Sequence, residues 1–194
     1  MCREDCYGSP AWYSGLYFGE LKAFYDKYPN KYNVASESCC AVWGSGIQPE
    51  RNLEFAERYA QDIIGSFKNG LNAYCDWNLT LDENNGPFHN RTGRGCSVET
   101  PVYCNKQTGE VILRLSYYYI GHVSKFIKRG AKVINASAYT DDLDYCAFKN
   151  PDGQVVLVVL NRGDKNRSLI VRLDGHIYRT EMSAHSIATF IINK

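Results

Sequence analysis

Residues 49–75 read PERNLEFAERYAQDIIGSFKNGLNAYC, and this stretch decides the fold class. From Pro49 to Lys68, apolar side chains recur every three or four residues, which predicts an amphipathic helix. We expect the helix to end at Asn69-Gly70, because glycine adopts the left-handed conformation that often terminates helices. Residues 71–75 then predict a short strand.

A similar pair of elements precedes this stretch. The pattern predicts a helix over residues 15–28, ended by Pro29, and a strand over residues 31–35. Helices alternating with strands, joined by short turns, are typical of a parallel sheet covered by helices. Residues 82–97 predict a polar loop directly after this region, and loops in that place often carry the active sites of α/β folds.

The pattern changes in the last third of the chain. After a final predicted helix over residues 115–127, apolar or alternating runs predict strands at 155–160, 169–173 and 187–192. We therefore predict an α/β domain over residues 1–129 and an antiparallel β domain over residues 130–194.

Composition excludes some classes of function and indicates a compartment. The 194 residues have a net charge of +1 and no basic cluster, which argues against nucleic acid as a partner. The eight cysteines favour an oxidising compartment, as do four glycosylation sequons, at Asn78, Asn90, Asn135 and Asn166. Residues 1–6 lack the apolar core of a signal peptide, so we expect a secretory chain from which the signal is missing.

Two groups of residues follow predicted strands and could carry chemistry. Glu37 comes directly after the strand over residues 31–35, where a carboxylate can act as a nucleophile or base. A solvated loop glutamate is the competing interpretation. Asp76-Trp77-Asn78 follows the strand over residues 71–75, and aspartate can bind sugar hydroxyls while tryptophan stacks on sugar rings. A turn aspartate beside a core tryptophan is the alternative.

Other candidates have weaker patterns. Trp12 and Tyr13 are aromatic residues suited to a sugar cleft or to a core, and His89 lies in the polar loop. The cysteines lack the paired spacing of a structural zinc site, and no glycine-rich phosphate loop occurs. We therefore expect no metal and no cofactor.

Taken in order, several of these segments resemble glycoside hydrolase family 30, most closely its glucosylceramide-cleaving branch. The resemblance extends over nearly the whole chain and is carried by an ordered set of motifs: Trp12-Tyr13, Ala35-Ser36-Glu37-Ser38-Cys39, Asp76-Trp77-Asn78-Leu79, Gly86-Pro87, residues 119–127, Asp152-Gly153 and Asn161-Arg162.

The resemblance implies a fold and an activity. The fold would be the C-terminal part of a (β/α)₈ barrel followed by an antiparallel β-sandwich, and the activity that of a retaining β-glycosidase. Glu37 would be the nucleophile, and Tyr13 would lie against it. Asp76 and Trp77 would line the sugar pocket, with Trp12, Asn78 and His89 as further substrate-binding residues. The implied substrate is glucosylceramide or another β-glucoside, and the implied location is lysosomal or extracellular. The lipid substrate would bring peripheral contact with a membrane.

Two departures from the family pattern shape these expectations. Ala11 stands where the family has histidine before Trp-Tyr, and no Asn-Glu-Pro motif, which carries the family's acid/base glutamate, occurs in the chain. We therefore expect a fragment that lacks the N-terminal half of the barrel. The alternative is a catalytically inactive paralogue or fragment that acts as a sugar- or partner-binding module.

Overall fold

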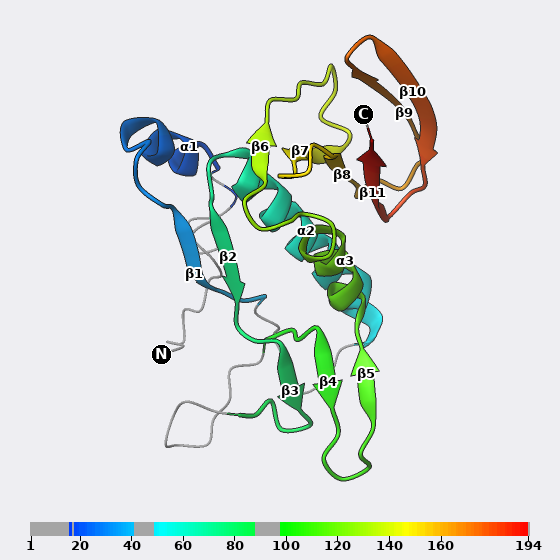
Figure 1. Ribbon diagram of the computed structural model, residues 1–194. Coiled ribbons are helices and arrows are strands. Elements are labelled where there is room, and N and C mark those ends of the chain that lie inside the picture. The colour runs from blue at the N-terminus through cyan, green and yellow to red at the C-terminus, as the bar shows by residue number, and fades with distance from the viewer. Residues whose placement is uncertain (1–15, 17, 41–48, 88–97, 194) are drawn as a thin grey trace. The chain divides into compact units, whose positions relative to one another are not determined.

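A computed structural model describes residues 16, 18–40, 49–87 and 98–193 of the chain. The chain divides into two compact units, Met1–Ile120 and Gly121–Lys194. Figure 1 labels the helices and strands of both units.

The first unit opens with the alternating helices and strands that the apolar patterns predict, and β1 pairs with β2 in parallel. In chain order these elements are α1 (Phe18–Lys27), β1 (Val34–Ser38), the 3-10 turn η2 (Pro49–Arg51), α2 (Asn52–Lys68) and β2 (Ala73–Asp76). Because β1 and β2 are joined through α2, they form the β/α/β unit from which parallel sheets are built.

The ladder between β1 and β2 has an irregular register. Ala35 lies opposite Tyr74, and Ser38 lies opposite Asp76, so β1 has one residue more than β2 between these pairs. This bulge extends β1 to Ser38. The predicted strand over residues 31–35 is therefore wrong in its position, and Glu37 lies within the strand rather than after it.

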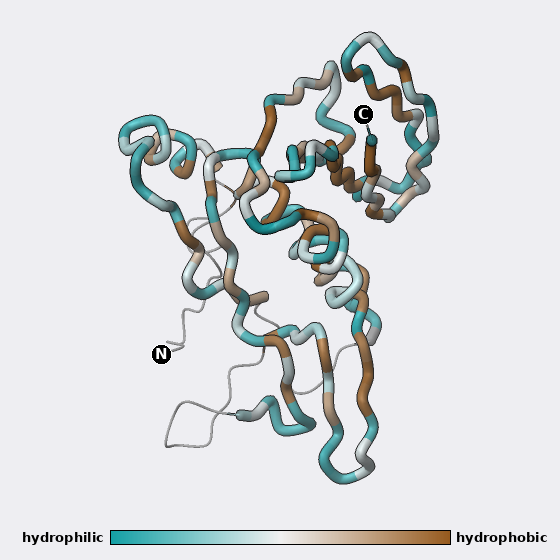
Figure 2. Tube along the Cα trace, viewed as in Figure 1, coloured by the Kyte–Doolittle hydropathy of each residue, from teal (hydrophilic) through white to brown (hydrophobic). Residues whose placement is uncertain are grey.

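Helix α2 forms most of the core of the first unit. Its apolar stripe packs inward, as predicted, and Figure 2 shows brown and teal alternating along the helix. Phe55 and Tyr59 are buried against Cys40, with Ile120 beside them. Burying side chains of this size stabilises a fold by about 1.5–3 kcal/mol each. The fully and nearly buried residues of α2 are Phe55, Ala56, Tyr59, Ala60, Asp62, Ile63, Ile64 and Ser66.

A small mixed sheet follows β2. It consists of β3 (Thr80–Asp82), β4 (Val102–Cys104) and β5 (Val111–Leu113), with β3 parallel to β4 and β4 antiparallel to β5. The predicted loop begins at the end of β3, a strand too short to give a periodic signal. Helix α3 (Leu115–Ser124) then starts where predicted and ends three residues earlier than expected.

The second unit is an antiparallel β structure, as the alternating runs predict. One sheet has the strand order β11-β8-β7-β6, and β9 pairs with β10 in a separate ribbon. The strands are β6 (Lys132–Ile134), β7 (Asp144–Lys149), β8 (Val155–Asn161), β9 (Arg167–Leu173), β10 (His176–Met182) and β11 (Ser186–Ile192).

Strand β8 lies at the centre of this second unit. All seven of its residues are buried, and Leu157 and Val159 pack with Ala147 of β7 and Met182 of β10. Side chains of β9 and β11 cover the same cluster, which joins the ribbon to the four-stranded sheet. A fully apolar run is typical of a strand covered on both faces.

Candidate active site

The ends of β1 and β2 bring together most of the residues that the sequence singled out. Glu37 has an exposed side chain near the end of β1, and Ser38 beside it is buried. The backbone N–H of Trp77 donates to the Ser38 carbonyl at 2.5 Å, which fastens the residue after β2 to the end of β1. Catalytic side chains of parallel α/β folds gather at the carboxyl ends of the strands, so this edge is the candidate site.

Trp77 and Asn78 lie just beyond β2. Trp77 is partly buried and packs against Cys39, Leu81 and Val98. The Asn78 side-chain oxygen accepts a hydrogen bond from the Thr80 N–H at 3.1 Å, which leaves its amide nitrogen as a donor. A role of either residue in sugar binding stays a prediction. Trp12, Tyr13 and His89 lie outside the described residues.

Asp76, the last residue of β2, interacts with α2. Its Oδ2 accepts a hydrogen bond from the Tyr59 hydroxyl at 3.2 Å, and its Oδ1 is buried with no hydrogen-bond partner. Burial raises the pKa of Asp76 from 3.8 to about 7, and the hydrogen bond from Tyr59 lowers it in part. A role of Asp76 in sugar binding stays a prediction. Its hydrogen bond with Tyr59 also connects the end of β2 to α2.

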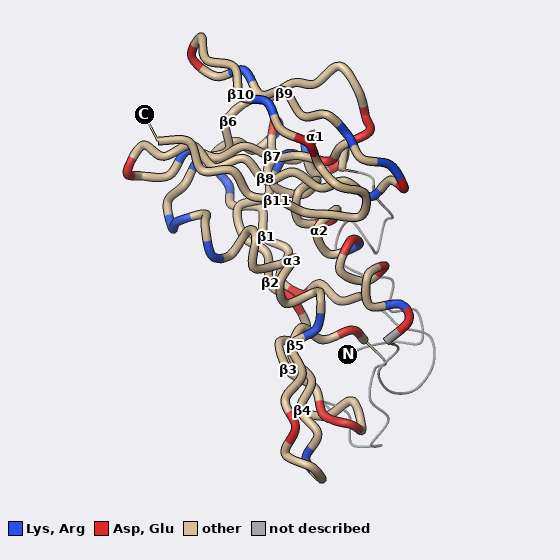
Figure 3. Tube along the Cα trace, turned by 90° about the vertical axis from the view of Figure 1, so that its right-hand side faces the viewer, with Lys and Arg blue, Asp and Glu red and all other residues tan. Residues whose placement is uncertain are grey.

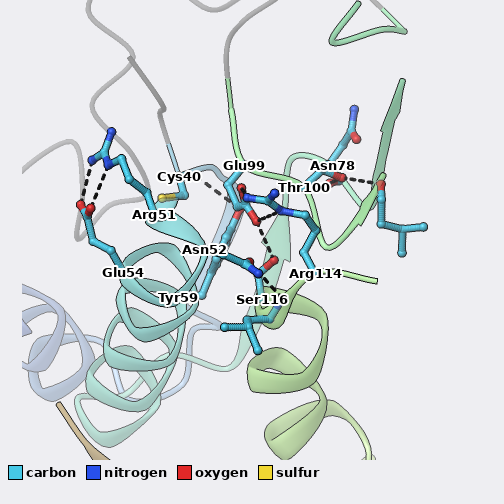
Figure 4. Close-up of polar contacts among 12 residues, drawn as sticks. Cys40, Arg51, Asn52, Glu54, Tyr59, Asn78, Glu99, Thr100, Arg114 and Ser116 are labelled. Atoms are coloured by element: carbon cyan, nitrogen blue, oxygen red, sulfur yellow. Dashed lines mark hydrogen bonds and ion pairs between the residues drawn. The ribbon is translucent and has the colours of Figure 1, made fainter. Parts of the chain in front are cut away.

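A buried ion pair lies beside this edge, as Figure 4 shows. Arg114 donates to both carboxylate oxygens of Glu99, at 2.9 and 2.7 Å, and both side chains are only 4% exposed. The Ser116 hydroxyl adds a third bond to Glu99 at 3.0 Å. The Glu99 N–H donates to the Cys40 carbonyl at 2.8 Å, so the ion pair supports the segment that follows β1.

Sequence reasoning missed Tyr59, Glu99 and Arg114. Tyr59 belongs to the apolar stripe of α2. The sequence pattern of the stripe does not show whether the hydroxyl of a tyrosine there forms hydrogen bonds or whether only its ring packs in the core. Glu99 and Arg114 are 15 residues apart and belong to no periodic element, so only the fold brings them together.

The turn after β3 is held by one carboxylate. Asp82 Oδ1 accepts hydrogen bonds from the Asn84 and Gly86 N–H groups at 2.9 and 2.7 Å, and Oδ2 pairs with Lys106. The hydrogen bond from Lys106 lowers the pKa of Asp82. A Cβ at Gly86 would lie 2.9 Å from Asp82 Oδ2, so this close approach requires glycine. Figure 3 shows residues of both charges along this part of the first unit.

The described residues give three further facts about the chemistry of the chain. They contain no group of three or more histidine, cysteine or acidic side chains that could hold a metal ion. Three of the cysteines, Cys40, Cys75 and Cys104, are free thiols. Within the same ranges, no helix has the length and apolar character needed to cross a membrane.

Comparison with known proteins gives the chain a family. Residues 18–127 match the TIM-barrel domain of glycosyl hydrolase family 30, and residues 130–190 match the β-sandwich domain of that family. The chain is 28% identical over 168 residues to the lysosomal acid glucosylceramidase of Mus musculus. That match includes 84% of this chain but 32% of the mouse protein, so the chain spans about a third of its relative's length.

Solved structures agree with the family models. The fold is similar to SrfJ from Salmonella typhimurium, with a TM-score of 0.86 and 29% identity, over 94% of this chain and 40% of that one. It is also similar to the endo-β1,6-glucanase BT3312, with a TM-score of 0.75 and 29% identity, over 91% of this chain and 39% of that one. The two units are therefore the C-terminal part of a (β/α)₈ barrel and a β-sandwich, and the chain belongs to glycosyl hydrolase family 30.

Proposed function

We propose that this chain carries the nucleophile of a retaining β-glycosidase, and that Glu37 is that nucleophile. The observation that carries the proposal is an exposed glutamate at the carboxyl end of β1, beside the Trp77-Asn78 segment that follows the parallel strand β2. In the first step, a Glu37 carboxylate oxygen attacks the anomeric carbon of the sugar and the bond to the aglycone oxygen breaks. Water then opens the covalent glycosyl ester.

The second carboxyl group of the reaction has to be supplied from outside these 194 residues. Retaining hydrolysis uses two carboxyl groups about 5–5.5 Å apart, of which one protonates the leaving oxygen. The chain contains no Asn-Glu-Pro motif and spans 32% of its mouse relative. We therefore propose that an N-terminal half of the barrel completes the site, and that the barrel and sandwich domains meet near residue 130.

For the substrate we propose glucosylceramide, in a lysosomal or extracellular setting where the lipid brings peripheral membrane contact. The mouse relative, a lysosomal acid glucosylceramidase, favours this choice. A β-1,6-glucan is the second candidate, because an endo-β1,6-glucanase has the same fold at nearly the same identity. The alternative without catalysis is an inactive chain that binds sugars through Trp77 and Asp76.

An activated trapping reagent tests the role of Glu37 without requiring the second carboxyl group. The dinitrophenolate of 2,4-dinitrophenyl 2-deoxy-2-fluoro-β-glucoside leaves without a proton, so attack by the nucleophile alone forms the covalent ester. We expect mass spectrometry of the full chain to find one fluoroglucosyl group on the peptide that contains Glu37, and none on the Glu37→Gln variant.

The same assay separates the competing interpretations. An unlabelled wild-type chain that still binds glucose would favour the inert binding module and contradict the catalytic proposal. If labelling succeeds, competition by glucosylceramide in detergent or by a β-1,6-glucan oligosaccharide distinguishes the two substrates. The substrate that slows labelling at the lower concentration is the one that the pocket accepts.

A further inference from the structure

The backbone just after the candidate nucleophile is held at both of its polar groups. Cys40 is fully buried, its N–H donates to the Tyr59 hydroxyl oxygen at 3.4 Å, and its carbonyl accepts the Glu99 N–H at 2.8 Å. Figure 4 shows Tyr59 on α2 reaching toward Cys40. Glu37 lies three residues earlier with its side chain exposed, so the direction of its carboxylate depends on where this segment is held.

The hydrogen bonds of Tyr59 determine the direction of its proton. A phenol hydroxyl has one hydrogen to donate, and the Asp76 carboxylate at 3.2 Å accepts it. The lone pairs of the same oxygen then face the Cys40 N–H. Asp76 therefore orients the Tyr59 hydroxyl as an acceptor for the backbone of the segment after β1.

These contacts close a ring between three elements. The segment after β1 contacts α2 through Cys40 and Tyr59, α2 contacts β2 through Tyr59 and Asp76, and Trp77 returns to β1 by donating to the Ser38 carbonyl. Glu37 is the residue immediately before Ser38 and is itself left out of the ring. The ring thus fixes the strand end without using the carboxylate of Glu37.

Burying the Asp76 carboxylate is energetically unfavourable, and packing does not compensate for it. Its Oδ1 is buried without a partner, and an unsatisfied buried carboxylate oxygen is unfavourable. Titratable and charged groups from each neighbouring element surround Asp76 and its partners. They are Tyr59, Asp62 and Arg58 of α2, Tyr74 of β2, Cys40, and Glu99 with its partner Arg114.

We propose that Tyr59 and Asp76 are positioning residues for Glu37, acting through the backbone at Cys40. Because the role of Glu37 is itself proposed, this inference rests on the proposed function and deepens it. Displacing a reacting group by about 1 Å can slow an enzyme roughly a hundredfold, so a modest shift of the strand end has a measurable effect.

The test compares two tyrosines whose hydroxyls link α2 and β2. Tyr59→Phe removes the link to Cys40, whereas Tyr74→Phe removes the bond from the Tyr74 hydroxyl to Asp62 at 2.8 Å and leaves the Tyr59 hydroxyl between Asp76 and Cys40 in place. The readout is the rate constant for trapping by the dinitrophenyl fluoroglucoside. We expect Tyr59→Phe to trap about tenfold more slowly than wild type, or worse, and Tyr74→Phe to stay within about twofold.

Two further measurements separate positioning from general loosening of the fold. Amide hydrogen exchange should become faster at Cys40 in Tyr59→Phe and remain unchanged there in Tyr74→Phe. The dissociation constant of the trapping reagent should stay the same in Tyr59→Phe, because only the rate constant depends on the direction of Glu37. A raised dissociation constant for Asp76 variants would instead mark Asp76 as a sugar ligand and overturn its positioning role.

Asp76 variants keep the test decisive if Tyr59→Phe does not fold. Asp76→Asn retains an oxygen for the Tyr59 hydroxyl and should lose less trapping rate than Asp76→Ala, which removes it. Equal slowing by Tyr59→Phe and Tyr74→Phe, or equal rates for Asp76→Asn and Asp76→Ala, would overturn the inference while leaving labelled Glu37 as nucleophile. If wild type is not labelled at all, the proposed function fails and the positioning roles fail with it.

Discussion

The two units bury polar groups in different ways. In Gly121–Lys194 the buried Asn161 uses its side chain fully, donating to three backbone carbonyls and accepting the Gly163 N–H. In Met1–Ile120 the described residues hold three of the four buried side-chain atoms that lack partners, and two of these, on Ser38 and Asp76, lie opposite one another across β1 and β2. Unsatisfied polar groups that gather at one sheet edge indicate a functional site, whereas satisfied ones indicate a structural role.

Breaking the ion pair beside that edge should give the largest effect. Arg114→Met leaves Glu99 buried without its cation, and loss of one partner of a buried pair costs about 3–5 kcal/mol. Urea denaturation of the full chain, followed by amide exchange in the first unit, measures it. The control is Arg162→Met, whose ion pair with Asp144 is partly exposed and should be worth about 1 kcal/mol or less. If both variants lose the same free energy of unfolding, the buried ion pair of the first unit contributes no more than the partly exposed pair of the second.

Asp76 should make stability depend on pH. Its pKa is raised from 3.8 to about 7, so the folded chain binds this proton more tightly than the unfolded chain. The contribution of Asp76 to the free energy of unfolding is therefore greatest below about pH 4, decreases between pH 4 and 7, and is constant above pH 7.

The Asp76→Asn variant cannot titrate at this position and should lack that decrease. Above pH 7 it should be more stable than wild type by up to about 4 kcal/mol, at about 1.4 kcal/mol for each unit of pKa shift. Denaturation of both proteins from pH 4 to 8 gives the difference. A difference that does not change with pH would show that Asp76 is ionised throughout the folded state.

Asn161 tests the second unit, where the buried polar side chain has all of its hydrogen-bond partners. Asn161→Ala leaves the carbonyls of Lys165, Met182 and Ser183 without this donor, which should cost the second unit about 2–3 kcal/mol. The matched control is Asn166→Ala, which removes a more exposed amide and should cost less than about 1 kcal/mol. If the two losses are equal, burial of the amide is not the source of its contribution.

The smallest effect should come from the bond between α3 and β11. The Thr189 hydroxyl donates to the His122 carbonyl at 3.0 Å, so its oxygen must accept the proton of His122 Nδ1 at 2.9 Å. Thr189→Val keeps the shape and removes both bonds, with an expected loss of about 1 kcal/mol. A nuclear magnetic resonance measurement of the His122 tautomer should find the Nδ1 proton in wild type and a mixture in the variant.

Long periodic segments made most of the fold predictable. The stripe of α2 and the apolar run of β8 each bury one continuous surface, so period and length were enough to place them. The position of β1 was not predictable in the same way, because Ala35 and Ser38 are both buried across an inserted residue and break the alternation of a regular strand. Short strands such as β3 give no period to detect.

The candidate site was predictable only where residues are near in sequence. Glu37 lies near the end of β1 and the Asp76-Trp77-Asn78 segment begins at the end of β2, and the parallel register of the two strands brings them to one edge. The hydroxyl of Tyr59 and the pair of Glu99 with Arg114 depend on contacts between distant segments. Such contacts leave no local pattern, so the supporting residues could not be predicted from the sequence.

The extra residue in β1 has a consequence for engineering this family. With it, both Ser36 and Glu37 point away from the buried side, and the next buried position falls on Ser38. Deleting Ser36 would restore the regular two-residue repeat and leave Ala35 and Ser38 buried, with Glu37 exposed between them. The carboxylate would keep its face, but it would lie one residue nearer to the start of the strand. Deleting Glu37 would restore the same repeat and remove the carboxylate, so only Ser36 can be taken out without losing the candidate nucleophile.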